Sequence, residues 1–109
     1  MNQTAAPLPR GESEFEKFNI ASVPSLKVRP PRVAEAPVAF ECRLDRIVQI
    51  GAGPLGSNVV FGTILSAHIS ESVLGADGTI DQHKLDTIGR MGGDYYTRTT
   101  ELFTIVRPR

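Results

Sequence analysis

A chain of 109 residues with balanced charge offers no strong electrostatic field to a partner. It contains 12 Lys and Arg residues against 12 Asp and Glu residues, and 40% of its residues are hydrophobic. This length predicts one domain, or part of one, with a modest core. The mixed, neutral charge pattern excludes the broad basic surface that nucleic acids and anionic membranes require, so neither partner is predicted.

The single cysteine and the absence of long apolar runs indicate a soluble protein of a reducing compartment, and we predict a cytoplasmic location. Cys42 has no partner for an internal disulfide. Its place in an alternating pattern predicts a small buried residue rather than a reactive thiol. Met1–Thr4 shows no signal-peptide pattern. The uncharged stretch Ile47–Ser70 contains glycines, a proline and polar side chains, which favours β structure over a membrane span.

The first third of the chain predicts little regular structure. Prolines and a glycine interrupt residues 1–12. A short helix is predicted over Ser13–Phe18, because its first residue can cap it and Asn19 can end it in a left-handed conformation. Prolines make residues 20–37 an extended connection, in which Ser25–Arg29 is predicted to pair briefly as an edge strand.

Two long strands are predicted in the middle of the chain. In Val38–Ile50, apolar residues alternate with Ala, Glu, Arg and Asp, so the face of Phe40, Cys42 and Leu44 is predicted to be buried. The glycine-rich loop at 51–58 has no following lysine or helix, which argues against a phosphate-binding loop.

The second strand is predicted over Val59–Leu74, with Val59, Phe61 and Leu65 on its core face. His68 falls on the opposite face, among glycine and serine, where a ligand or a second subunit can approach closely. A lone histidine in this position is either a hydrogen-bonded structural residue or a site residue. Because His83 is distant and no cysteine pair or carboxylate cluster is present, no metal site is predicted.

The last third begins with turn residues at 75–78. Asp81 is predicted to cap a short helix over Gln82–Thr87, with Leu85 and Ile88 facing inward. A closing strand is predicted over Glu101–Val106, on the alternation of its side chains.

The segment between that helix and that strand combines glycines, tyrosines and arginines. Gly92 and Gly93 permit a backbone turn with positive φ. Arg90, Tyr95 and Tyr96 supply a cationic fork and aromatic faces, which suit a flat anionic ligand. The alternative is a connecting loop whose tyrosines are half-buried for packing.

Five segments in this order resemble one known family. They are Pro9–Phe15 (PRGESEF), Val28–Val38 (VRPPRVAEAPV), Phe40–Leu44 (FECRL), Ala67–Ile69 (AHI) and Gly89–Tyr96 (GRMGGDYY). Together they resemble the flavin-reductase-like, FMN-binding split-barrel proteins, over nearly the whole chain. The resemblance implies a mainly β fold with short helices, an antiparallel split β-barrel. The barrel would be partial, because residues 1–109 resemble only the C-terminal portion of the domain, a little over half.

The resemblance also implies a homodimeric flavoprotein with FMN, or FAD in its place, near the subunit interface. NADH or NADPH would reduce the flavin, often for a partner oxygenase. The chemistry belongs to the flavin, so no catalytic residue of the protein is predicted. The residues that the resemblance places near the cofactor are His68, Arg90, Gly92, Gly93, Tyr95 and Tyr96.

Three functional hypotheses follow. The chain is part of an NAD(P)H-dependent flavin reductase, or a non-catalytic truncated module that acts through dimerisation or partner binding, or a stand-alone β domain whose flavin site is inactive. Much of the family's FMN phosphate and ribityl site lies outside the portion matched here, so we expect the chain alone to bind FMN weakly or not at all. An open sheet with apolar edges also needs cover from another chain, which predicts a dimer or larger assembly.

Overall fold

The structure of the chain, a computed structural model, describes residues 2–109, apart from the side chains of Asn2 and Leu55. It divides into two compact units, Met1–His68 and Ile69–Arg109. The elements, with η marking a 3-10 helix, are η1 (Asn2–Ala5), α1 (Glu14–Lys17), β1 (Ser22–Val23), β2 (Arg32–Val33), β3 (Val38–Ile50), η2 (Gly53–Leu55), β4 (Ser57–Ile69), η3 (Glu71–Val73), α2 (Gln82–Leu85), β5 (Ile88–Arg90) and β6 (Tyr96–Arg98). The predicted mainly β fold with short helices is confirmed.

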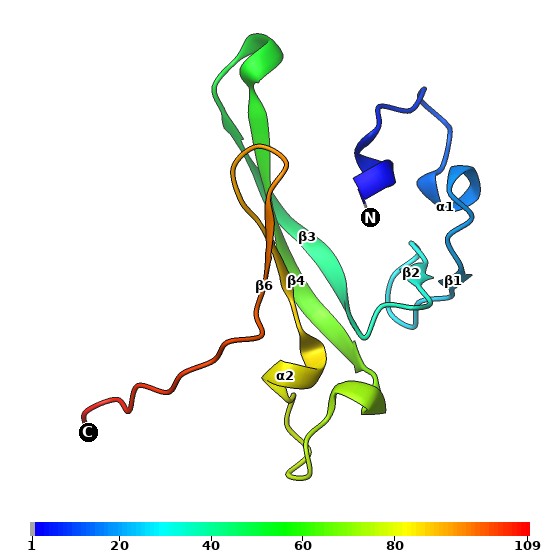
Figure 1. Cartoon of the computed structure of the whole chain (residues 1–109). Coiled ribbons are helices and arrows are strands. Elements are labelled where there is room, and N and C mark those ends of the chain that lie inside the picture. The colour runs from blue at the N-terminus through cyan, green and yellow to red at the C-terminus, as the bar shows by residue number, and fades with distance from the viewer. Residues whose placement is uncertain (1) are drawn as a thin grey trace. The chain divides into compact units, whose positions relative to one another are not determined.

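The first unit is dominated by the hairpin of β3 and β4, two strands of 13 residues that pair with each other (Figure 1). Their short connection at 51–56 permits only antiparallel pairing. It turns with Gly51 at φ 72° and Gly53 at φ 69°, a conformation that favours glycine. The bounds of β3 are those predicted. β4 ends at Ile69 rather than at Leu74, because the chain turns there into η3.

The prediction of which side chains are buried on β3 was wrong. Phe40 is 57% exposed, Leu44 is 58% exposed, and Cys42 is an exposed free thiol. The buried residue of β3 is Glu41, which is 1% exposed. Polar contacts to the carboxylate, rather than apolar packing, therefore determine which side of the strand turns inward.

The predicted core face of β4 was also wrong for this chain. Val59, Phe61 and Leu65 are exposed, as is the opposite face along most of the strand. Only near the end of β4 does exposure fall, at Ser66 and His68. Neither face of the hairpin acts as a closed core within the described residues.

The segment before β3 contains two small differences from prediction. A 3-10 helix, η1, forms where no regular element was expected, whereas α1 and the left-handed Asn19, at φ 50°, are confirmed. The predicted edge strand Ser25–Arg29 was wrong, because β1 and β2 pair with each other on either side of it. The physical reason lies in the amides of this segment, which bond to a side chain rather than to a strand.

The second unit contains the predicted turn and helix. Gly75 and Gly78 close the turn, and Asp81 caps α2 by accepting hydrogen bonds from the next amides along the chain. The helix ends at Leu85, two residues earlier than predicted, because Asp86 adopts a left-handed φ of 43°. Leu85 is half-buried as expected, but Ile88 is exposed rather than inward-facing.

The glycine-tyrosine segment forms a second hairpin, β5–β6. Ile88 pairs with Arg98, and Arg90 pairs with Tyr96, across a turn in which Gly93 has φ 60°. The predicted closing strand Glu101–Val106 was wrong, since residues 99–109 contain no regular element. Positive φ at the turn lets the chain fold back at once, so the strand partner of β5 is the nearer segment.

Candidate functional site

A buried carboxylate lies at the centre of the first unit. Glu41 accepts hydrogen bonds from the backbone amides of Leu26, at 2.8 Å to Oε1, and Lys27, at 2.5 Å to Oε2. The Nε2 atom of His68 lies 2.6 Å from Oε1. The carboxylate therefore joins β3 to the end of β4 and to the loop between β1 and β2.

The pKa of Glu41 reflects this surrounding. Burial acts to raise it, but the two amides and His68 outweigh that cost and lower the pKa of Glu41 to about 2. The Nε atom of Arg32 adds positive charge 3.7 Å from Oε1. That Nε is buried and makes no hydrogen bond within the described part of the chain, so Arg32 acts here as a nearby charge.

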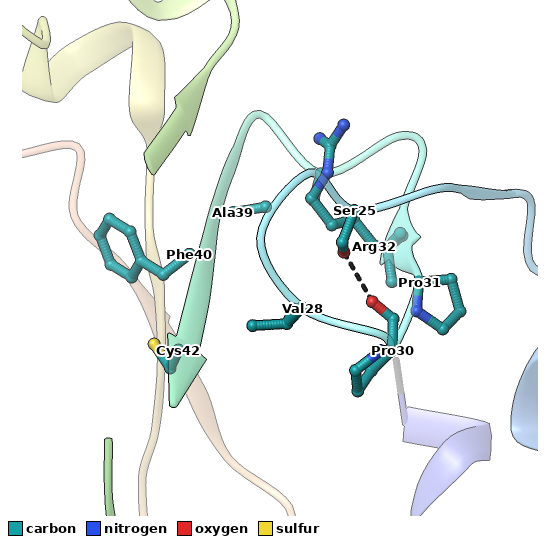
Figure 2. A pocket seen from close by; sticks show the side chains of 10 residues that line it. Ser25, Val28, Pro30, Pro31, Arg32, Ala39, Phe40 and Cys42 are labelled. Carbon is teal, nitrogen blue, oxygen red and sulfur yellow. Dashed lines mark hydrogen bonds between the residues drawn. The ribbon is translucent and has the colours of Figure 1, made fainter. Parts of the chain in front are cut away.

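The loop that Glu41 holds forms one wall of a cavity of about 380 Å³. Figure 2 shows the Val28 side chain pointing from the loop toward β3 and Ala39 pointing from β3 toward the loop, whereas Phe40 and Cys42 point to the other side of the strand. The Ser25 hydroxyl donates to the Pro30 carbonyl at 2.6 Å, which closes the loop on itself (Figure 2). The lining is mainly apolar. It is therefore suited to packing rather than to a charged ligand.

His68, a predicted site residue, takes part in this cluster through one ring nitrogen. An ionised carboxylate can only accept hydrogen bonds, so Nε2 must be the donor to Glu41. Through Nε2, His68 is thus a hydrogen-bonded structural residue, which is one of the two alternatives that the sequence left open. The side chain remains partly exposed, and Nδ1 bonds to no residue that the structure describes.

The other five predicted site residues lie together on the β5–β6 hairpin in the second unit. Arg90 and Tyr96 are partners across the strands, and Tyr95 is 78% exposed at the end of the turn. A Cβ placed on Gly92 or Gly93 would meet open space. Tyr95 is not half-buried by packing, but Tyr96 is 44% exposed, so the alternative hypothesis of a packed connecting loop still fits one of the two tyrosines.

The second arginine of this segment has a structural partner that the sequence did not indicate. Arg98 on β6 pairs with the carboxylate of Asp86, which directly follows α2. This pairing raises the pKa of Arg98 through the hydrogen bond and the charge of Asp86. Thr87 and Thr99 add a hydroxyl contact at 2.9 Å. The hairpin is therefore anchored through Arg98.

The sequence did not indicate Glu41, because the residue lies on the polar face of β3, which the alternation predicted to face solvent. The only available signal was its place in the quoted segment Phe40–Leu44. Among the described residues, no group of three or more His, Cys, Asp or Glu side chains could hold a metal ion. No helix in the same part of the chain is long and apolar enough to cross a membrane.

The comparisons with known proteins identify the class of this fold. Residues 1–89 match the family described as Flavin reductase like domain. The structure resembles nitrilotriacetate monooxygenase component B from Bacillus cereus, with a TM-score of 0.85 and 31% identity over 95% of this chain and 52% of that one. The chain therefore belongs to the flavin reductase-like family, and its split-barrel fold class is confirmed.

Two further similar proteins show what share of a relative's length this chain covers. YwrF of Bacillus subtilis is 33% identical over 99% of this chain and 54% of its own length. The 2-nitrobenzoate 2-nitroreductase NbaA of Pseudomonas fluorescens is 29% identical, with a TM-score of 0.75, over 88% of this chain and 48% of its own. The chain thus spans about half the length of the relatives it matches.

The family binds flavin, and the donor chemistry of the β5–β6 hairpin fits such a ligand. Arg90 offers a planar donor fork to a phosphate or a ring carbonyl. Tyr95 and Tyr96 offer aromatic faces for stacking, although adjacent strand residues point to opposite sides. The open space at Gly92 and Gly93 leaves the turn accessible to a flat ligand.

Proposed function

We propose that this chain takes part in the reduction of flavin by NAD(P)H, as the C-terminal portion of an FMN-dependent flavin reductase domain. The observation that carries the proposal is the family match over residues 1–89. The exposed Arg90 and Tyr95, presented on a hairpin with an open glycine turn, support it independently. FMN is the first cofactor to test, and FAD the second.

In this function the residues of the chain bind and orient, and none forms a bond to the substrate. Arg90 neutralises negative charge on the flavin, and one of the two tyrosines contacts its ring. Arg98 holds the hairpin in place through Asp86. His68 approaches the flavin or the nicotinamide through its unoccupied ring nitrogen. The single free cysteine, Cys42, agrees with a reducing compartment such as the cytoplasm.

The direct test is a flavin fluorescence titration of the purified chain, combined with NADH and NADPH oxidation. We expect weak but saturable FMN binding by the chain alone, with a dissociation constant above micromolar, because ligands need convergent polar groups from all sides. Absence of binding and of NAD(P)H oxidation, even at high flavin concentration, would reject this function for the chain by itself. Stoichiometric binding at sub-micromolar concentration would show that the site is placed wrongly.

The contribution of Arg90 can be measured in the same titration. Losing one charged hydrogen bond costs about 1.5–3 kcal/mol, so Arg90→Ala should weaken flavin binding roughly tenfold to a hundredfold. Arg107→Ala, in the exposed tail outside any regular element, is the matched control and should leave binding unchanged. If Arg90→Ala lowers the melting temperature but not the affinity of the folded protein, the hairpin is structural.

A second candidate function is favoured by the exposed apolar hairpin. A non-catalytic module could act through dimerisation, or through binding of a partner, along β3 and β4. The two candidates share an expected homodimer but differ in flavin chemistry. Component B of a monooxygenase is among the relatives, so we infer that reduced flavin would pass to a partner oxygenase in the first case. A module that self-associates and lacks flavin-dependent oxidation of NAD(P)H would establish the second.

A further inference from the structure

In the pair formed by Glu41 and His68, the Nε2 atom of the ring is hydrogen-bonded to the carboxylate, whereas Nδ1 is available to a ligand. Nε2 donates to Oε1 at 2.6 Å, because an ionised carboxylate has no proton to give. Nδ1 makes no hydrogen bond to any residue in the described part of the chain. The ring is partly exposed, so a ligand can reach this nitrogen.

The surroundings of Glu41 disfavour the opposite arrangement, in which a protonated carboxyl group would donate to an unprotonated Nε2. Its oxygens also accept the backbone amides of Leu26 and Lys27, which cannot change their protonation. The Nε of Arg32, 3.7 Å away, adds positive charge that favours an ionised carboxylate. Of the groups around Glu41, the His68 ring alone has two possible proton positions in its neutral form.

We propose that Glu41 is a positioning residue for His68, holding the proton of the neutral ring on Nε2 and thereby presenting Nδ1 as a hydrogen-bond acceptor to the ligand. A matching donor is an N–H group, such as the imide of a flavin ring or the carboxamide of a nicotinamide. The identity of this ligand rests on the proposed function. The position of the proton rests on the contacts of the pair alone, and no covalent bond is made or broken.

The test is nitrogen NMR of the full chain with ¹⁵N-labelled histidine. The sequence has two histidines, so His83, which is exposed on α2, serves as an internal control. At about pH 8.5, where free imidazoles are neutral, we expect the neutral ring of His68 to carry its proton on Nε2 and none on Nδ1. His83 should show an average of both tautomers. A His68 ring that is averaged like His83, or protonated at Nδ1, would overturn the proposal.

Glu41→Leu tests the cause of this preference, because it removes both acceptor oxygens while keeping a side chain of similar volume. No carboxylate then holds the proton of the neutral His68 ring on Nε2, and we expect its tautomer ratio to change at least tenfold, toward that of His83. Asp45→Asn, which alters an exposed carboxylate on the same strand, should change nothing. An unchanged His68 tautomer in a folded Glu41→Leu variant would contradict the assignment. If the variant does not fold, the measurement on the unaltered chain still decides it.

Addition of FMN separates this proposal from the proposed function. Binding, followed by fluorescence, should shift the Nδ1 resonance of His68 and leave His83 unaffected. The same titration is made with NADH, and binding of both FMN and NADH without movement of the Nδ1 resonance would refute the role of this nitrogen in ligand contact. Failure of FMN to bind would contradict the flavin function instead, and the tautomer measurements would still decide what Glu41 does.

Discussion

Glu41 shows how a charged residue can be buried without being left unsatisfied. Two backbone amides and an imidazole converge on its two oxygens, which replaces the hydrogen bonds that water would provide. Because the amides belong to a loop and the imidazole to another strand, the side chain fixes three segments at one point. Replacing Glu41 by a residue of similar shape and no charge removes the hydrogen bonds to an ionised carboxylate, while the position stays buried.

The first prediction concerns acid stability. The folded pKa of Glu41, about 2, lies below its ordinary value of 4.5, so its contribution to stability is fully present above pH 4.5. That contribution is lost as the pH falls from 4.5 toward 2. Glu41→Gln lacks it at every pH. We therefore expect the variant to be less stable than the unaltered chain at pH 7, with a gap that closes below pH 4.5.

Urea unfolding at a series of pH values measures this gap. Asp45→Asn is the control, because Asp45 and its neighbour Arg46 form an ion pair that is largely exposed. Such pairs contribute little to stability, so the control should follow the unaltered chain at all pH values. A gap between Glu41→Gln and the unaltered chain that stays constant down to pH 2 would show that the charge of Glu41 is unimportant.

Residue-scale prediction from sequence succeeded for local features and failed for distant ones. The left-handed Asn19 and the capping Asp81 were predictable, because a cap depends on neighbours within three or four positions. The role of Glu41 was not, since its partners lie 14 to 27 residues away in the chain. Alternation on β3 even indicated the opposite orientation.

At the scale of elements, α2 and α1 form a natural comparison, because each has four residues and a candidate N-cap. The Oδ1 atom of Asp81 accepts from the amides of His83 and Lys84, at 2.9 and 3.2 Å. Ser13 occupies the same position before α1 but its side chain makes no cap hydrogen bond. Two residues in the same N-cap position of the sequence therefore differ in the structure, because only Asp81 makes the capping hydrogen bonds.

This difference gives the second prediction of stability. Asp81→Ala should destabilise the protein by about 1 kcal/mol, the usual cost of losing an N-cap. Ser13→Ala should stay within about 0.5 kcal/mol of the unaltered chain, as exposed substitutions usually do. Chemical denaturation of both variants at pH 7 makes the comparison. Equal losses in the two variants would indicate that α2 depends on tertiary packing rather than on its cap.

Element prediction was accurate where periodicity was long and poor where it was short. The 13-residue β3 was predicted residue for residue, whereas the closing strand at 101–106 does not form. A five- or six-residue alternation also fits an extended tail, because a strand requires a partner with free amides. Here β5 takes its partner from Tyr96–Arg98, only a turn away.

At the scale of the molecule, the β3–β4 hairpin exposes apolar side chains on both faces. Val60 is 63% exposed and Ile64 is 55% exposed, and they share a face because they are four residues apart on one strand. Paired strands with uncovered apolar faces favour association with another polypeptide. The six candidate site residues are divided between the two units, with His68 in the first and the other five in the second.

The last prediction is that the chain self-associates through this hairpin. Sedimentation velocity at micromolar concentration should show a dimer or a larger species. Burying a Val or Ile side chain contributes about 1.5–3 kcal/mol, so Val60→Lys and Ile64→Lys should each weaken association at least tenfold. Both side chains are exposed within the chain, so circular dichroism should show unchanged folding.

Phe103→Lys is the matched control for these variants. Phe103 is 86% exposed, more than either hairpin residue, but it lies in the tail beyond β6, where no regular element forms. The same apolar-to-charged change should therefore leave the sedimentation coefficient as it is. A compact, stable monomer of the unaltered chain would contradict the dimer. If Phe103→Lys weakens association as much as Val60→Lys does, the contact is not specific to the hairpin. A contact on β3 and β4 requires that only the variants of the hairpin weaken association.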